Sequence, residues 1–118
     1  MHRCRHVVLA LDEDYRLVGM APLPRNHEPL ETAHIVEIVR ELGAAGAVAA
    51  TLRPGGDQPT PGETDVTQFR RLVDASAAER VTLFDWVIFA GYGWWSMRER
   101  SGSGAAFPRR RDVEPRHP

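Results

Sequence analysis

The sequence contains no lysine, a single cysteine and no long hydrophobic run. One cysteine, Cys4, cannot form an internal disulfide, and it is compatible with a reducing compartment. The longest apolar stretches are residues 7–11 and 44–50, far shorter than the roughly 20 residues that a membrane-spanning helix needs. These absences argue against a disulfide-stapled secreted scaffold and a membrane protein, so we expect a cytoplasmic location.

Because lysine is absent, all 15 basic residues are arginine, and they are unevenly distributed. Residues 1–100 carry 11 arginines against 14 acids (net −3), and residues 101–118 carry 4 arginines against 2 acids (net +2). The acidic balance of the first segment argues against a dedicated nucleic-acid surface. The second segment is rich in Gly, Ser, Pro and Arg, which predicts a mobile tail. Its run Arg109–Arg111 can contact nucleic acid or an acidic partner, or only keep the chain soluble.

The length of 118 residues allows one hydrophobic core, which we place in a domain spanning residues 1–100. The continuous apolar run 5–11 is typical of a strand covered on both faces, and residues 15–20 complete a β-hairpin with it. A proline-containing loop, 21–29, leads to a helix that we expect to begin near Pro29. Ile35, Ile38, Val39 and Leu42 give that helix one apolar stripe, and Gly43 is a candidate C-terminal cap.

In the second half of the domain, predicted strands and a predicted helix again follow one another. Residues 44–50 predict a central strand, 53–62 a Gly- and Pro-rich loop, and the Thr60–Glu63 pattern a capped start for a second helix. We expect that helix to bury Val66, Phe69, Leu72 and Val73. After this helix we expect a strand over 81–90, a turn at 91–93 and a closing strand over 94–97. The predicted fold class is α/β, with one mixed β-sheet, two main helices and the order β-β-α-β-α-β-β.

The stretch 51–65, TLRPGGDQPTPGETD, resembles the RadC family of bacterial JAB/MPN domains, which have a cytidine-deaminase-like fold and whose loop reads His-Asn-His-Pro-Ser-Gly-Asp followed by Ser-x-x-Asp. The segment 83–88, LFDWVI, is similar to that family's Leu-Leu-Asp-His-Ile-Ile strand, and 95–100 to its closing segment. The resemblance covers about residues 5–102. RadC has been labelled a DNA repair protein.

Active relatives hold Zn²⁺ with two His and one Asp, and a Glu acts as general base, which is the arrangement of catalytic zinc. Carried onto this chain, the two His positions are Thr51 and Arg53, and Asp65 keeps the third ligand position. The oxyanion-stabilising Ser falls on Gly62. The general-base Glu falls on Met20 or Ala21, and Trp86 stands where the family has a further His.

These substitutions predict that the chain binds no metal or other cofactor. A neutral threonine hydroxyl is a poor zinc ligand, and the permanently charged guanidinium of Arg53 repels a cation. Arg53 and Asp65 can instead form an ion pair that replaces the metal. The five histidines (His2, His6, His27, His34 and His117) show no zinc-binding spacing, although a loop can bring His27 towards Asp57.

We therefore interpret the chain as a catalytically inactive JAB/MPN domain, a pseudoenzyme of metalloprotease-like origin that acts in binding, assembly or regulation. Its partner is a protein, a peptide or a second copy reached through an exposed sheet edge, where Trp94 or Trp95 can anchor an interface. One alternative is a zinc-dependent isopeptidase-type hydrolase with displaced ligands. The other is a nucleic-acid-binding protein associated with DNA repair.

Overall fold

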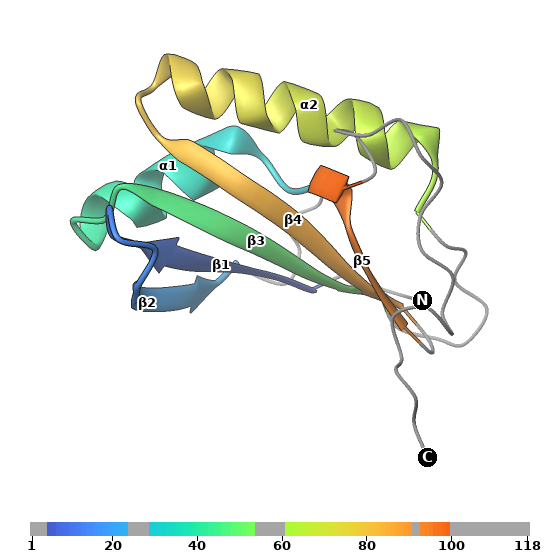
Figure 1. The fold of residues 1–118 in the computed structure, drawn as a ribbon, viewed down its shortest axis with the longest axis horizontal. Coiled ribbons are helices and arrows are strands. Elements are labelled where there is room, and N and C mark those ends of the chain that lie inside the picture. Colours follow the sequence, from blue (N-terminus) through green and yellow to red (C-terminus); the bar gives the residue numbers. More distant parts are fainter. Residues whose placement is uncertain (1–4, 24–28, 54–60, 91–92, 100–118) are drawn as a thin grey trace.

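The fold is a five-stranded mixed sheet with two helices, seen in a computed structural model (Figure 1). The structure describes residues 5–23, 29–53, 61–90 and 93–99. The elements are β1 (Arg5–Leu11), β2 (Leu17–Pro22), α1 (Thr32–Glu41), β3 (Gly46–Arg53), α2 (Glu63–Ala78), β4 (Thr82–Ala90) and β5 (Gly93–Ser96), followed by one helical turn at 97–99. This order and the α/β class confirm the prediction from the sequence. The predicted tail, 101–118, and most of the turn at 91–93 lie outside the described residues.

The strand order, β2-β1-β3-β4-β5, explains where the helices lie. β1 is antiparallel to β2 and β3, whereas β3 and β4 are parallel. The connections β2–α1–β3 and β3–α2–β4 therefore both join parallel strands, and both move in the same direction across the sheet. Because such crossovers are right-handed, both helices fall on the same face (Figure 1). The described elements form two layers, and no described helix or strand covers the second face of the sheet.

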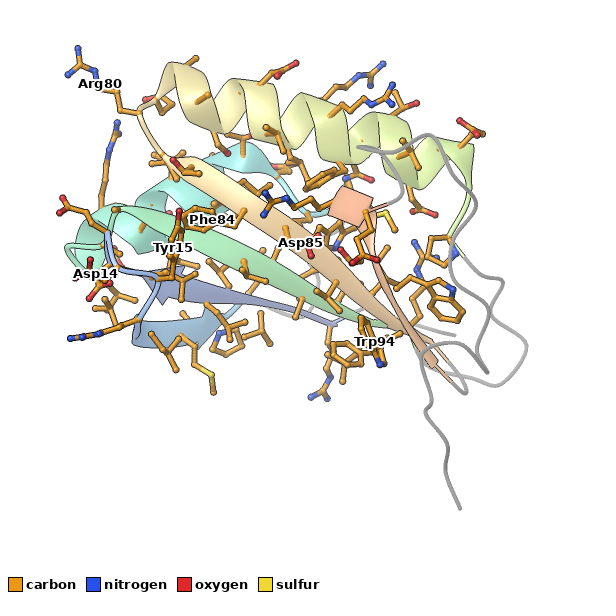
Figure 2. All side chains as sticks on the ribbon, in the orientation of Figure 1. Asp14, Tyr15, Arg80, Phe84, Asp85 and Trp94 are labelled. Carbon is orange, nitrogen blue, oxygen red and sulfur yellow. The ribbon has the colours of Figure 1, made fainter. Side chains whose placement is uncertain are left out.

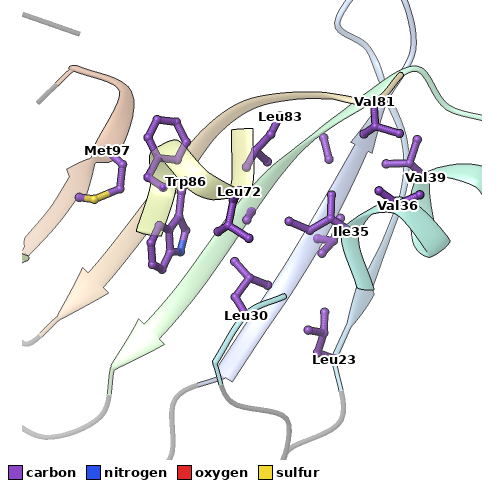
Figure 3. Packing of buried hydrophobic residues seen from close by; sticks show 14 of the residues in the cluster. Leu23, Leu30, Ile35, Val36, Val39, Leu72, Val81, Leu83, Trp86 and Met97 are labelled. Atoms are coloured by element: carbon purple, nitrogen blue, oxygen red, sulfur yellow. The ribbon is translucent and has the colours of Figure 1, made fainter. Parts of the chain in front are cut away.

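The core lies between the helices and the face that they cover, which we call the helix face (Figure 3). Alternate strand residues point into it, as the two-residue period of a strand requires. Its buried hydrophobic members are Val8, Leu23, Leu30, Ile35, Val36, Val39, Ala47, Ala49, Phe69, Leu72, Val81, Leu83, Trp86, Ile88, Trp95 and Met97. The buried stripe of α1 centres on Ile35, Val36 and Val39, while Leu42, which the sequence pattern placed in the stripe, is 38% exposed.

The second strand was predicted two residues too early. It begins at Leu17 and extends to Pro22, because Ala21 and Pro22 still pair with β1. Pro22 is tolerated there since β2 is an edge strand, where a missing N–H costs no ladder bond. The expectation that β1 is buried on both faces was wrong for the described chain: His6, Val8 and Ala10 are buried, and the residues between them are only half-buried.

The helix starts also differ from the predictions, whereas the cap at Gly43 is confirmed. α1 begins at Thr32 after Glu31, so Pro29 precedes the helix. α2 begins at Glu63 with Gly62 as its N-cap, so Thr60 is not the cap. Gly43 has a φ of +65°, and it ends α1 in a Schellman motif in which Ala44 donates to the Val39 carbonyl. Within the described residues, neither helix has the length and apolar content to cross a membrane.

Candidate functional site

The candidate site lies where β3 ends and α2 begins. Thr51 and Arg53 are two residues apart in β3, so both side chains point to the helix face. Asp65 is the third residue of α2, one turn after Gly62. The structure thus brings three sequence-predicted positions, Arg53, Gly62 and Asp65, into direct contact, and it places Thr51 on the same face of the sheet. The connecting residues 54–60 lie outside the described part of the chain.

Arg53 and Asp65 form an ion pair that is largely shielded from solvent. Nη2 of Arg53 lies 2.6 Å from Oδ1 of Asp65, and the two side chains are only 14% and 17% exposed. The other carboxylate oxygen, Oδ2, accepts the backbone N–H of Gly62 at 2.9 Å. Gly62 has no side chain that could cap α2, and the Asp65 carboxylate accepts the N–H of this N-cap residue. Both oxygens that a metal would use are therefore hydrogen-bonded within the protein.

Thr51 is 1% exposed, and its hydroxyl connects three strands. Nε1 of Trp86 in β4 donates to Thr51 Oγ1 at 2.7 Å, and Nδ1 of His6 in β1 lies 2.8 Å from the same oxygen. Because the indole can only donate, the hydroxyl accepts from Trp86, and it can donate a hydrogen bond to Nδ1 of His6 in the tautomer in which that nitrogen carries no proton. The hydroxyl is thus committed to the core network.

The sequence reading did not identify His6 as part of this site. His6 is directly opposite Thr51 in the β1–β3 register, and Trp86 lies two residues from the β4 partner of Thr51, Ile88, and therefore on the same face. The alternation of β1 places His6 on the helix face, which is the signal that could have found it. The pairing partner follows only from the strand register, which the sequence does not show.

The two candidates for the general-base position lie on opposite faces of the sheet. Ala21 pairs with Val8 and faces the helices, whereas Met20 pairs with Leu9 on the other face and is 63% exposed. Position 21 therefore shares its face with Arg53 and Asp65, and the Met20 alternative was wrong. A methyl group at position 21 can neither accept nor deliver a proton.

The donor set does not fit a catalytic zinc ion. Such an ion needs three protein ligands and an open position for water. Here position 51 supplies a hydroxyl already engaged with Trp86, position 53 supplies a cation, and both oxygens of Asp65 are engaged. Within residues 5–23, 29–53, 61–90 and 93–99, three or more His, Cys, Asp or Glu side chains nowhere gather closely enough to hold a metal. His27 and Asp57 lie outside those residues.

Asp85 makes a second polar network, on the face away from the helices (Figure 2). Its Oδ1 accepts the backbone N–H groups of Trp86 at 2.6 Å and Arg98 at 3.0 Å. Its Oδ2 accepts the Ser96 hydroxyl at 2.6 Å. Asp85 thereby ties β4 to β5 and to the helical turn at 97–99. In this structure it positions backbone and does not belong to the site around Asp65.

The two tryptophans proposed as interface anchors have different environments. Trp95 is 5% exposed and packs in the core, so its selection as an interface residue was wrong. Trp94 is 43% exposed on the opposite face. Adjacent strand residues point to opposite faces, and the helix face takes Trp95 because its register partner, Ile88, is a core residue.

Comparison with protein families agrees with the motifs and the fold. Residues 3–103 match the family model of the RadC-like JAB domain. The match includes all seven elements, the ion pair and the Thr51 network. The chain therefore belongs to the RadC-like JAB domain family.

Proposed function

We propose that this chain is a non-catalytic JAB domain that acts by binding other protein chains, and that it has no role for zinc. The observation that carries the proposal is the 2.6 Å Arg53–Asp65 contact. A guanidinium remains protonated at any working pH, so its positive charge permanently occupies the place beside the carboxylate. The guanidinium compensates the negative charge of Asp65. Unlike a zinc ion, it can neither coordinate a substrate nor activate a water molecule.

The neighbouring positions support the same interpretation. Hydrolysis of an amide requires a nucleophile, a proton acceptor and a group that stabilises the oxyanion. Position 21 is an alanine, position 62 is a glycine without a hydroxyl, and the Thr51 hydroxyl is held by Trp86. The ion pair instead fixes the end of β3 to the first turn of α2. The proposed role of this former site is therefore structural, and binding is assigned to other surfaces.

Zinc analysis of the purified full-length chain tests the proposal. We expect elemental analysis after dialysis against zinc to find far less than one zinc per chain. The variant Asp65→Asn should change neither that content nor its dependence on added chelator, and Asp74→Asn, on the exposed side of α2, serves as the matched control. Stoichiometric zinc that is lost in Asp65→Asn and kept in Asp74→Asn would refute the proposal and favour a hydrolase with displaced ligands.

A further inference from the structure

The sheet face away from the helices, which we call the open face, carries apolar side chains from all five strands. The strand registers place the side chains of Leu52, Phe89 and Trp94 in one row, and those of Met20, Leu9 and Val48 in another. Exposed large hydrophobic residues of this face are Leu17 57%, Met20 63%, Leu52 47%, Phe89 44% and Trp94 43%, with Val18 44% at the adjoining bulge of β2. Figure 2 shows Trp94 on the side of the sheet away from α1 and α2.

The exposed apolar area of this face is large for a monomer and amounts to a little over half of what one partner contributes to a typical dimer. With about 150–250 Å² for a large side chain, these six residues together expose on the order of 500 Å². The half-buried Val7, Leu9 and Val87 add to this area. A typical specific interface takes about 800 Å² from each partner, whereas a monomer rarely exposes apolar patches of more than a few hundred Å².

The sequence of β1 is that of a strand with both faces covered, whereas in the described chain its apolar residues on the open face are only half-buried. Val7, Val8, Leu9, Ala10 and Leu11 form a continuous apolar run, the pattern of a strand buried on both faces. A strand with one face permanently in water alternates apolar and polar residues instead. α1 and α2 account for the burial of Val8 and Ala10, and no described element accounts for Val7, Leu9 and Leu11.

The charges of the open face suit a second copy of the same face. Arg5 lies at its corner and Asp85 within it, so two identical faces meet without a net like charge. The Asp85 oxygens already accept three hydrogen bonds, so covering this carboxylate leaves no unsatisfied acceptor. The other rows of this face are mainly aliphatic or aromatic and end in the uncharged Ser96 and Thr82, a composition that can pack on itself as the inner faces of a β-sandwich do.

We propose that two copies of this chain associate through their open faces to form a two-fold symmetric dimer with Trp94 at the contact. In such a dimer the same patch serves both copies, which closes the assembly at two. The inference rests on the proposed function in that it names the partner of the binding module. The proposed function and the proposed dimer can be refuted separately. The zinc content tests the site around Asp65, and the oligomeric state tests the open face.

Sedimentation equilibrium of the full chain across a wide concentration range tests the dimer. We expect the wild-type mass to rise from 13.2 kDa to twice that value with increasing concentration. Met20→Glu and Leu52→Glu should each weaken association at least about 100-fold, because each dimer would bury two uncompensated carboxylates. Ala33→Glu, which adds the same charge on the exposed side of α1, should leave association unchanged.

Tryptophan emission supplies a second measurement that does not depend on mass. Trp86 and Trp95 are buried, so a concentration-dependent blue shift should come from Trp94 and vanish in Trp94→Phe. Met20→Gln adds no charge, so it should weaken the dimer less than Met20→Glu does. It replaces Met20→Glu in the experiment if that variant fails to fold. A wild-type chain that stays monomeric at high micromolar concentration would overturn the proposal, leaving the face to another segment or a different protein. A dimer insensitive to both glutamate variants would also overturn it.

Discussion

At the scale of single residues, Arg53 and Asp65 form the strongest polar contact of the site. Two charges with 14% and 17% exposure have lost most of their hydration, and each depends on the other to compensate. Removing one partner leaves a buried charge without compensation, which costs about 3–5 kcal/mol. Removing both costs less, because no isolated charge remains.

A double-mutant cycle with Arg53→Met and Asp65→Asn should show this dependence. We expect each single variant to lose about 3 kcal/mol of unfolding free energy, and the double variant to lose clearly less than the sum. Urea unfolding gives these values. The exposed pair Arg40–Glu79, with side chains 60% and 53% exposed, is the control, and its coupling should stay below about 1 kcal/mol. Additive losses at Arg53 and Asp65 would contradict the assigned importance of the contact.

The resemblance indicated which residues of this chain stand at the family's ligand positions, because the motif spacing is local. It did not indicate the Thr51 network, since His6 and Trp86 come from strands 45 and 35 positions away. Nor could it choose between Met20 and Ala21. A shift of one residue along β2 exchanges the two faces, and only the register settles that choice.

At the scale of elements, the two helices end in the same motif with different residues. α1 uses Gly43 at the left-handed position, whereas α2 uses Arg80 with a φ of +64°. In both motifs, backbone N–H groups after the helix satisfy its last carbonyls, and for α2 Val81 donates to Ser76. A residue with a Cβ is strained in this conformation, and glycine is not.

Arg80→Gly should therefore stabilise the protein. We expect a gain of about 1 kcal/mol in unfolding free energy, because the strain at φ +64° is relieved at an exposed position. The control, Ala78→Gly in the last turn of α2, should lose a similar amount through helix propensity. Urea unfolding of both variants measures the difference. A loss of stability in Arg80→Gly would show that the arginine side chain makes a contact worth more than the strain.

Periodicity predicted the seven elements and their order, while their ends depended on tertiary contacts. The Thr60–Glu63 pattern has the residues of a capping box, yet α2 starts at Glu63. The N–H of its N-cap residue, Gly62, is held by Asp65, whose carboxylate is in turn held by Arg53 from another element. The aromatic contact between Tyr15 and Phe84, with ring centroids 4.9 Å apart, was equally invisible in the sequence (Figure 2). It joins the hairpin turn to the bulge of β4.

At the scale of the whole molecule, the direction of the two crossovers decides what remains uncovered. Among the described elements, the helices cover one face of the sheet and leave apolar side chains of the other face exposed, and it is this face that we propose to be a binding surface. The alternation of helices and strands predicted the α/β class with one mixed sheet and two main helices, without saying whether the helices share a face. The side on which each helix lies follows from strand order, which depends on long-range pairing.

Coupling between folding and the proposed dimer should make thermal stability depend on concentration. We expect the Tm of the wild-type chain to rise with protein concentration, because association removes native monomers from the unfolding equilibrium. Met20→Glu should abolish that dependence, and Ala33→Glu should keep it. Differential scanning calorimetry over a hundredfold concentration range measures both. A wild-type Tm that does not change with concentration would argue against association in the native state.

The position of Thr51 constrains how this chain can change over evolutionary time. Its hydroxyl is shared by Trp86 and His6, so the oxygen belongs to β1, β3 and β4 together. A histidine at position 51 would spend its one acceptor nitrogen on the Trp86 N–H and would have to fit a larger ring into a fully buried space. A metal ligand at this position is therefore useful only if Trp86 changes together with it.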